Sequence, residues 1–256
     1  ALLSDRAAMA DLTPMVQVVS AEKQGEISAE DAVMPLTEGD QVELRHAWDL
    51  LQAAEHILQD MEPGISERAE VEPDVEISGN VRIEANARVL NGARIKGNVY
   101  IGPGCMIGNG AMVRGNTSLA AGCVVGFSAE VNNSLLMERC GVGPVAFVAD
   151  SLVDRDCFFG GTARVSNYRL DGRDVEVMMN GRVESTGRRQ FGAIFGENAK
   201  IGVGCVIYPG RKIGADCMIG PNVNVARNIE SGQRIELDQK LRVTPAADNE
   251  IKTQME

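Results

Sequence analysis

The sequence predicts an all-β protein whose short parallel strands wind into a β-helix, and two observations support this prediction. Glycine is abundant, with 28 residues, while aromatic residues make up only 4% of the chain. Apolar residues also recur every six positions, and a unit this short can bury its apolar side chain only by stacking on further copies. The recurring residues are Ile77, Ile83, Val89, Ile95, Ile101, Ile107, Val113, Leu119, Val125 and Val131, and later Phe195, Ile201, Ile207, Ile213, Ile219 and Val225.

The chain before the repeats divides into two parts. Residues 1–39 carry no pattern that assigns a fold, and we expect this N-terminal segment to be partly disordered. A linker helix is predicted within residues 40–64, because Asp40 and Glu43 have the spacing of a capping box and Pro63–Gly64 would end a helix near residue 61. Its apolar stripe would consist of Leu44, Trp48, Leu51 and Leu58.

The repeats predict a domain over residues 65–230. Three hexads per turn give a triangular prism with a rise of about 4.8 Å per coil. The six-residue spacing shifts by one residue before Leu136 and again before Val153, which predicts short bulges at corners. Residues 167–193 interrupt the repeat and are expected to leave the coil as a protruding loop. Residues 231–256 are expected to form a polar C-terminal tail, with a strand near residues 234–243.

Composition excludes several functional classes. The formal net charge of −11 argues against a general nucleic-acid binder, which needs a basic surface. The sequence shows no segment long enough to cross a membrane and no basic-then-apolar leader. The six cysteines recur at multiples of the repeat, or one residue short of them, which favours small apolar core residues over disulfides. Free thiols indicate a reducing environment, so we expect a cytoplasmic protein.

Several segments in and around the interrupted part of the repeat resemble a known family, the left-handed β-helix acyltransferases built from hexapeptide repeats. The resemblance is closest to the acetyltransferase half of bifunctional sugar-1-phosphate nucleotidylyltransferase/acetyltransferases, which include N-acetylglucosamine-1-phosphate uridyltransferase. It covers residues 40–230. The segments that carry it are Ala47-Trp48-Asp49-Leu50-Leu51, Ala149-Asp150-Ser151, Gly161-Thr162, Asn167-Tyr168-Arg169-Leu170-Asp171-Gly172, Gly187-Arg188-Arg189-Gln190-Phe191-Gly192-Ala193 and Pro209-Gly210-Arg211-Lys212-Ile213-Gly214.

The resemblance implies a left-handed coil, a homotrimer, and acetyl-CoA bound between neighbouring subunits. It also implies acetyl transfer to the amine of an amino-sugar phosphate, with a His as general base. The position of that His holds Pro144, which cannot accept a proton. If the protein retains catalytic activity, a carboxylate must replace the His as the base. Asp150 is the candidate catalytic residue, and Glu130 and Asp154 are the alternatives. The alternative for Asp150 is a structural role in a corner.

Substrate-binding positions are partly retained. Arg114 resembles the family's phosphate-binding arginine, whose planar guanidinium suits a phosphate. Two expected lysines are replaced, by Asn132 and Gln190. Asn167 and Tyr168 resemble the family's sugar-contacting pair, and their alternative role is to begin the loop with a turn.

Four residues are candidates for binding acetyl-CoA. Arg188, Arg189 and Arg211 belong to a locally basic stretch that could attract the phosphates of the coenzyme, and Gly220 lies in a coil whose backbone would meet the pantetheine arm. The alternative is a solvated arm whose arginines are balanced by neighbouring carboxylates. No metal site is expected, because His46 and His56 are the only histidines and both fall on the predicted linker helix.

Two functions remain open at this stage. The first is an acetyl-CoA-dependent transferase of sugar-nucleotide metabolism with an altered or degenerate site and an amino-sugar phosphate or related acceptor. The second is a non-catalytic β-helix that serves as a trimerisation or regulatory scaffold for a separate nucleotidylyltransferase. A purely architectural oligomer is the default if neither ligand nor partner binds. Nucleotidyl transfer by the chain alone is not expected, because no Gly-rich phosphate-binding loop precedes the predicted helix.

Overall fold

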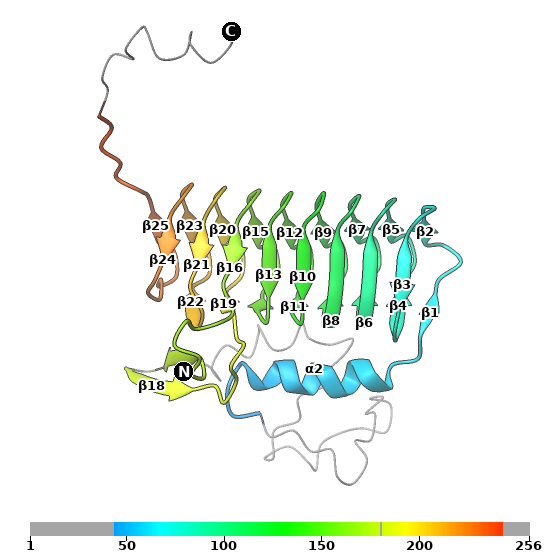
Figure 1. Ribbon diagram of the computed structural model, residues 1–256, viewed down its shortest axis with the longest axis horizontal. Coiled ribbons are helices and arrows are strands. Elements are labelled where there is room, and N and C mark those ends of the chain that lie inside the picture. The colour runs from blue at the N-terminus through cyan, green and yellow to red at the C-terminus, as the bar shows by residue number, and fades with distance from the viewer. Residues whose placement is uncertain (1–43, 180, 243–256) are drawn as a thin grey trace, which may run out of the picture.

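The computed structural model describes residues 44–179 and 181–242, which form a left-handed, triangular β-helix flanked by a helix and an arm (Figure 1). Every strand pair in the coil is parallel, so each face of the prism is a ladder of equivalent strands from successive coils. The predicted fold class is therefore confirmed. Residues 1–39, for which partial disorder is predicted, lie outside the described residues.

The strands lie on three faces. The first face contains β3 (Glu76–Ser78), the first halves of β6 (Arg94–Ile101) and β8 (Met112–Leu119), β10 (Glu130–Asn132), β13 (Phe147–Ala149), β16 (Arg164–Val165), β21 (Val206–Ile207) and β24 (Asn224–Val225). The second contains β1 (Gly64–Ile65), β4 (Val81–Ile83), the second halves of β6 and β8, β11 (Leu135–Leu136), β14 (Leu152–Val153), β19 (Ala193–Phe195) and β22 (Arg211–Ile213). The third contains β2 (Glu70–Val71), β5 (Arg88–Val89), β7 (Met106–Ile107), β9 (Val124–Val125), β12 (Gly141–Val142), β15 (Phe158–Phe159), β20 (Lys200–Ile201), β23 (Met218–Ile219) and β25 (Arg234–Ile235).

Strand register explains the one-residue shifts in the repeat. Val113 pairs with Val131, eighteen residues on, as three hexads require, whereas Val131 pairs with Val148, only seventeen residues on. The predicted bulges are therefore wrong, because these coils lose a residue at a corner instead of gaining one. The shortened corners contain Asn133 and Asp150, both in left-handed backbone conformation with φ of 46° and 48°.

The recurring apolar residues point into the prism and form its core. Nearly all are almost completely buried, but Ile77 is 37% exposed, because it lies in the first coil and has a neighbouring coil on one side only. Phe159 and Phe195 fill the interior with an edge-to-face contact whose ring centroids are 4.8 Å apart. Their packing supports the coils on both sides of the arm.

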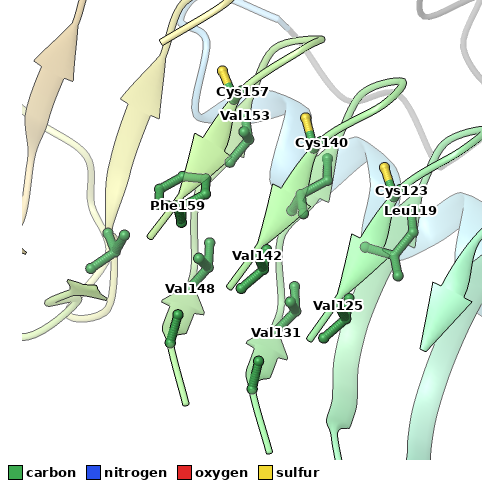
Figure 2. Packing of buried hydrophobic residues seen from close by; sticks show 14 of the residues in the cluster. Leu119, Cys123, Val125, Val131, Cys140, Val142, Val148, Val153, Cys157 and Phe159 are labelled. Atoms are coloured by element: carbon green, nitrogen blue, oxygen red, sulfur yellow. The ribbon is translucent and has the colours of Figure 1, made fainter. Parts of the chain in front are cut away.

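The cysteines form part of the same core, as predicted. Cys123, Cys140 and Cys157 stack in successive coils beside the apolar column (Figure 2). All six cysteines are buried with free thiols, and each described thiol hydrogen-bonds to a carbonyl oxygen, as Cys140 does with the carbonyl of Asp154 at 3.0 Å. The pKa of Cys140 is raised, first by its hydrogen bond with Cys123, so this thiol is protonated at neutral pH.

The flanking helix α2 (Asp49–Asp60) is shorter than predicted. Residues 44–48 form turns, in which the Asp49 carboxylate accepts the N–H groups of Arg45 and His46 at 2.8 and 2.7 Å. The predicted capping residues 40–43 lie outside the described residues. At the other end, the Asn80 side chain donates to the carbonyls of Leu58, Gln59 and Met61, which ties the end of the helix to a corner of the coil.

The arm extends from residue 168 to residue 190 and contains a hairpin, β17 (Glu176–Met179) and β18 (Arg182–Ser185). It leaves the coil one residue later than predicted and rejoins it before Ala193, where β19 begins. A second apolar core joins the arm to α2 and to the second face of the prism. Its buried members are Trp48, Leu51, Ala54, Leu135, Leu152, Val175, Val177, Met179 and Phe191.

The C-terminal part of the described chain contains one short strand. The strand predicted near residues 234–243 is limited to β25, after which the described residues run on without regular structure. Within residues 44–179 and 181–242, no helix has the length and apolarity needed to cross a bilayer.

Candidate functional site

The base of the arm is fixed to the coil by main-chain hydrogen bonds. Tyr168 and Gln190 form an antiparallel bridge where the chain leaves and returns. Phe191 donates its N–H to the carbonyl of Asn167 at 2.9 Å, and its side chain packs edge-to-face on Trp48. The predicted pair, Asn167 and Tyr168, therefore lies at a defined junction between the β-helix and the arm.

Asp150 lies directly beneath that junction and is only 4% exposed. Its Oδ1 accepts the side-chain N–H of Asn133 at 2.6 Å, and its Oδ2 accepts that of Asn167 at 2.5 Å. The three residues occupy the same corner in successive coils, seventeen positions apart. Both carboxylate oxygens are thus engaged inside the protein, which is the geometry of the structural alternative for Asp150.

A network of ion pairs links the residues of the first turn of the arm. The Arg169 guanidinium donates to both carboxylate oxygens of Asp171, at 3.0 and 2.6 Å, and to Glu176 at 3.1 Å. Arg173 adds a further bond to Asp171. These hydrogen bonds, from Arg169 first, hold the pKa of Asp171 well below its usual range, so the network stays charged at neutral pH. Leu170, between the paired residues, is fully exposed.

A groove of about 530 Å³ lies between this turn and the first face of the coil. Tyr168 forms one side of it, and Tyr208 and Pro209 come from the coil that follows the arm. Both tyrosine rings are roughly half exposed. Two aromatic faces with hydroxyl groups at their edges suit a ring-shaped polar ligand. Tyr168 is a candidate from the sequence, whereas Tyr208, forty residues later, has no motif around it that would identify it.

Arg114 is separated from the groove. It lies on the first face, where Asn132 and Ala149 are its register partners in the next two coils. Its Nε and Nη2 both lie 2.7 Å from Oε1 of Glu130. A phosphate at Arg114 would have to compete with this carboxylate. Glu130, one of the alternative bases, is engaged by the same pair.

Pro144 stands at an apolar corner. Its carbonyl accepts the N–H of Thr162, and nearby corner positions expose Phe127, Val145 and Val203 by 60%, 41% and 56%. Asp154, the other alternative base, lies at a different corner, after β14. Burial raises the pKa of the Asp154 carboxyl. The structure therefore brings neither Asp154 nor Pro144 to the groove residues.

The candidate coenzyme residues are spread over the arm and the last coils. Arg188 and Arg189 end the arm, and within the described parts of the chain their guanidiniums have no hydrogen-bond or ion-pair partner. Arg211 donates to the carbonyls of Pro209 and Ala226, and burial, followed by the charge of Arg169, lowers its pKa.

Gly220 is packed against the final coil. Its N–H donates to the carbonyl of Ile235 at 2.7 Å, and a Cβ at this position would lie 3.1 Å from the same oxygen. A side chain here would therefore crowd β25. Among residues 44–179 and 181–242, no three His, Cys, Asp or Glu side chains are grouped so that they could hold a metal ion.

Comparison with known proteins places these features in context. A family model described as bacterial transferase hexapeptide (six repeats) matches residues 192–227, and one described as GMPPB C-terminal domain matches residues 95–187. The uncharacterized acetyltransferase YaiX of Escherichia coli is 39% identical over 157 residues, which are 61% of this chain and 68% of that protein. A bifunctional sugar-1-phosphate nucleotidylyltransferase/acetyltransferase of Sulfurisphaera tokodaii is 30% identical over 210 residues, 78% of this chain and 52% of that protein.

The chain therefore spans about half the length of that bifunctional relative. Among solved structures, a mutant perosamine N-acetyltransferase from Caulobacter crescentus, in complex with CoA and GDP-perosamine, is 18% identical. That alignment covers 72% of this chain and 58% of the other, with a TM-score of 0.22.

Proposed function

Because the chain belongs to the left-handed β-helix acyltransferases built from hexapeptide repeats, we propose that it transfers an acetyl group from acetyl-CoA to an amino-sugar phosphate or a related acceptor. The reaction would belong to sugar-nucleotide metabolism, as the names of the relatives suggest. The acceptor would bind in the groove at the base of the arm. Acetyl-CoA would bind along the last coils, next to the end of the arm.

The observation that supports this proposal most strongly is the docked arm. Tyr168, its first residue, lines the groove, and its last residues include Arg188 and Arg189, which have no partners in the described chain. A solvated loop would not need buried apolar residues such as Val177 and Met179, which share the second core with Leu51 of α2. The packing therefore favours an arm that positions groups for a ligand.

The unpartnered arginines suit the phosphates of coenzyme A. Guanidinium groups pair with phosphate oxygens through two parallel hydrogen bonds, and the chain is otherwise acidic. Arg211 and Gly220 would contact the coenzyme further along the coil, Arg211 through its charge and Gly220 through its backbone. The acceptor site is altered relative to the family, because Pro144, Asn132 and Gln190 replace a base and two lysines that the resemblance implies.

A thiol-release assay with acetyl-CoA and glucosamine 1-phosphate tests this function. We expect turnover by the unaltered protein, and we expect the double substitution Arg188→Ala/Arg189→Ala to raise the KM for acetyl-CoA by roughly tenfold or more, since charge-assisted hydrogen bonds contribute about 1.5–3 kcal/mol each. Arg182→Ala, on the exposed hairpin of the same arm, is the matched control and should change little. An equal loss in both variants, or no thiol release by the unaltered protein, would contradict the proposal.

The second candidate is a non-catalytic scaffold for a separate nucleotidylyltransferase. Specific observations favour it: Pro144 lies at an apolar corner, Arg114 is paired with Glu130, and Asp150 is buried between two amides. A scaffold of this kind would neither bind acetyl-CoA nor release its thiol. In either role we propose a cytoplasmic homotrimer, for which light scattering should give three times the chain mass of 27.4 kDa.

A further inference from the structure

We infer that the first coil of the β-helix is a docking surface for a separate protein, which adds an extended segment with apolar and basic side chains to it. This coil consists of β1, β2 and β3 and lies at the end of the prism away from the arm (Figure 1). Within the described chain, each of the three strands pairs with another strand on one edge only. The inference is independent of the acetyl transfer proposed above.

The interior of the prism is open at this end. Ile65, Val71 and Ile77 are the inward residues of the first coil, and they are 51%, 37% and 37% exposed. Their register partners in the second coil are 1% exposed or less. At the other end of the prism, the inward residues Val225 and Ile229 are only 2% and 6% exposed. The end of a stacked repeat usually has a polar outer face, so the apolar surface at the first coil indicates a binding site.

The edge of the first coil also offers main-chain hydrogen bonds. The carbonyl of Val89 in the second coil accepts the N–H of Glu72 at 2.9 Å. Val71, its register partner, occupies the same position one coil earlier, so its carbonyl faces the open end. The carbonyl of Ile65 is in the same situation, because that of its register partner Ile83 accepts an N–H from the first coil. An extended segment can pair with such an edge as an additional strand.

The charge of the first coil selects a basic partner. Residues 64–78 carry five carboxylates and one arginine. The second coil shows how these carboxylates pair, since Arg88 donates to Glu70 at 3.0 Å and Arg94 lies 3.4 Å from Glu76. Each pair is in register, so the sign of the charge alternates from one coil to the next. A strand on the open edge would lie equally close to both glutamates, and the same pairing requires Lys or Arg in that strand.

Charge argues against two other occupants of the open end. A second copy of this chain, placed end to end, would bring a further five carboxylates against the first five. Residues 1–43 carry nine carboxylates and two basic side chains, so this segment is acidic as well. Like charges on neighbouring strands are destabilising. The occupant that fits both the apolar surface and its acidic rim is therefore a basic segment of another protein.

A synthetic peptide with the sequence of residues 81–96 provides a probe of this surface. It has the apolar and basic pattern that already pairs with the first coil on its other edge. Fluorescence anisotropy of the labelled peptide, titrated with the full chain, should show saturable binding. A control peptide with Arg82→Glu, Arg88→Glu and Arg94→Glu should bind about tenfold more weakly or worse, because its charges repel the carboxylates. No binding up to millimolar protein, or equal binding of both peptides, would overturn the inference.

Variants of the protein locate the binding. Glu70→Gln/Glu76→Gln should weaken binding of the unaltered peptide roughly three- to tenfold, since exposed ion pairs contribute about 0.2–1 kcal/mol each. Glu230→Gln/Glu236→Gln removes two carboxylates at the opposite end of the prism and is the matched control, which should bind as the unaltered protein does. Equal weakening in the two variants would show that the peptide responds to net charge alone and would contradict a site on the first coil.

Hydrogen exchange distinguishes the occupants directly. In the full chain alone, amides of β1, β2 and β3 should exchange rapidly, and the peptide should slow their exchange without changing that of β20 and β23. Protection in the protein alone that does not depend on concentration would assign the open end to residues 1–43. Protection that increases with protein concentration would assign it to a second copy. Either result, or peptide binding that leaves the first coil unprotected, would overturn the inference.

Discussion

Replacing Phe159 with Ala should lower the free energy of unfolding by about 3–5 kcal/mol, one of the largest effects that a single substitution in this chain can have. Phe159 is completely buried, and its ring contacts that of Phe195 edge-to-face across the interior of the prism. Coils on both sides of the arm therefore lose packing when the ring is removed. Urea denaturation followed by circular dichroism would measure the change.

The preceding residue provides a matched control. Phe158 points outward from the same strand, β15, and is 49% exposed. Phe158→Ala removes the same chemical group and should change the free energy of unfolding by no more than about 0.5 kcal/mol. Similar losses in the two variants would mean that the alternation of inward and outward residues along β15 is wrong.

Replacing Trp48 with Ala should release the arm from the prism. Trp48 is 3% exposed, contacts Phe191 edge-to-face at 6.2 Å and stacks on His46 at 4.3 Å. The arm residue Glu184 also lies 3.5 Å from the imidazole of His46, so the turn before α2 and the hairpin meet at this point. Loss of the indole should cost the docked arm about 3–5 kcal/mol, and amides of β17 and β18 should exchange with solvent roughly 100-fold faster or more.

The coil provides the internal reference for this experiment. Amides of β9 and β12, which do not touch the second core, should keep their protection in Trp48→Ala. Trp48→Phe, which retains an aromatic contact with Phe191, should protect the hairpin partly. If the hairpin amides exchange equally fast in all three proteins, the arm does not depend on Trp48, and the second core does not hold it.

The coil could be predicted from the sequence because the residue pattern that specifies it is local. An inward side chain recurs every six residues, and each inward position between Ile83 and Val131 is buried as expected. The bulges were predicted wrongly for the same reason: a spacing of five residues shows that the register shifts, but not whether a corner gains or loses a residue. The start of α2 was also misplaced, because Asp49 holds the N–H groups of Arg45 and His46 in a turn.

The second core could not be predicted, because its parts are far apart in the chain. Trp48 and Val177 are separated by more than a hundred residues, and no spacing relates them. The hydrogen bonds of Asp150 could have been anticipated from the sequence, since Asn133, Asp150 and Asn167 lie seventeen residues apart, the length of the shortened coil. The catalytic role suggested for Asp150 stays a prediction.

Calorimetric titration of the full chain with acetyl-CoA tests the central claim most directly. The account predicts saturable binding at micromolar to low millimolar concentration, with one site per chain, and weaker binding in Arg188→Ala/Arg189→Ala. Retained binding without thiol release on any amino-sugar phosphate would show that the coenzyme site persists and that the acceptor chemistry is lost. No heat of binding up to millimolar acetyl-CoA would contradict the account and favour the scaffold.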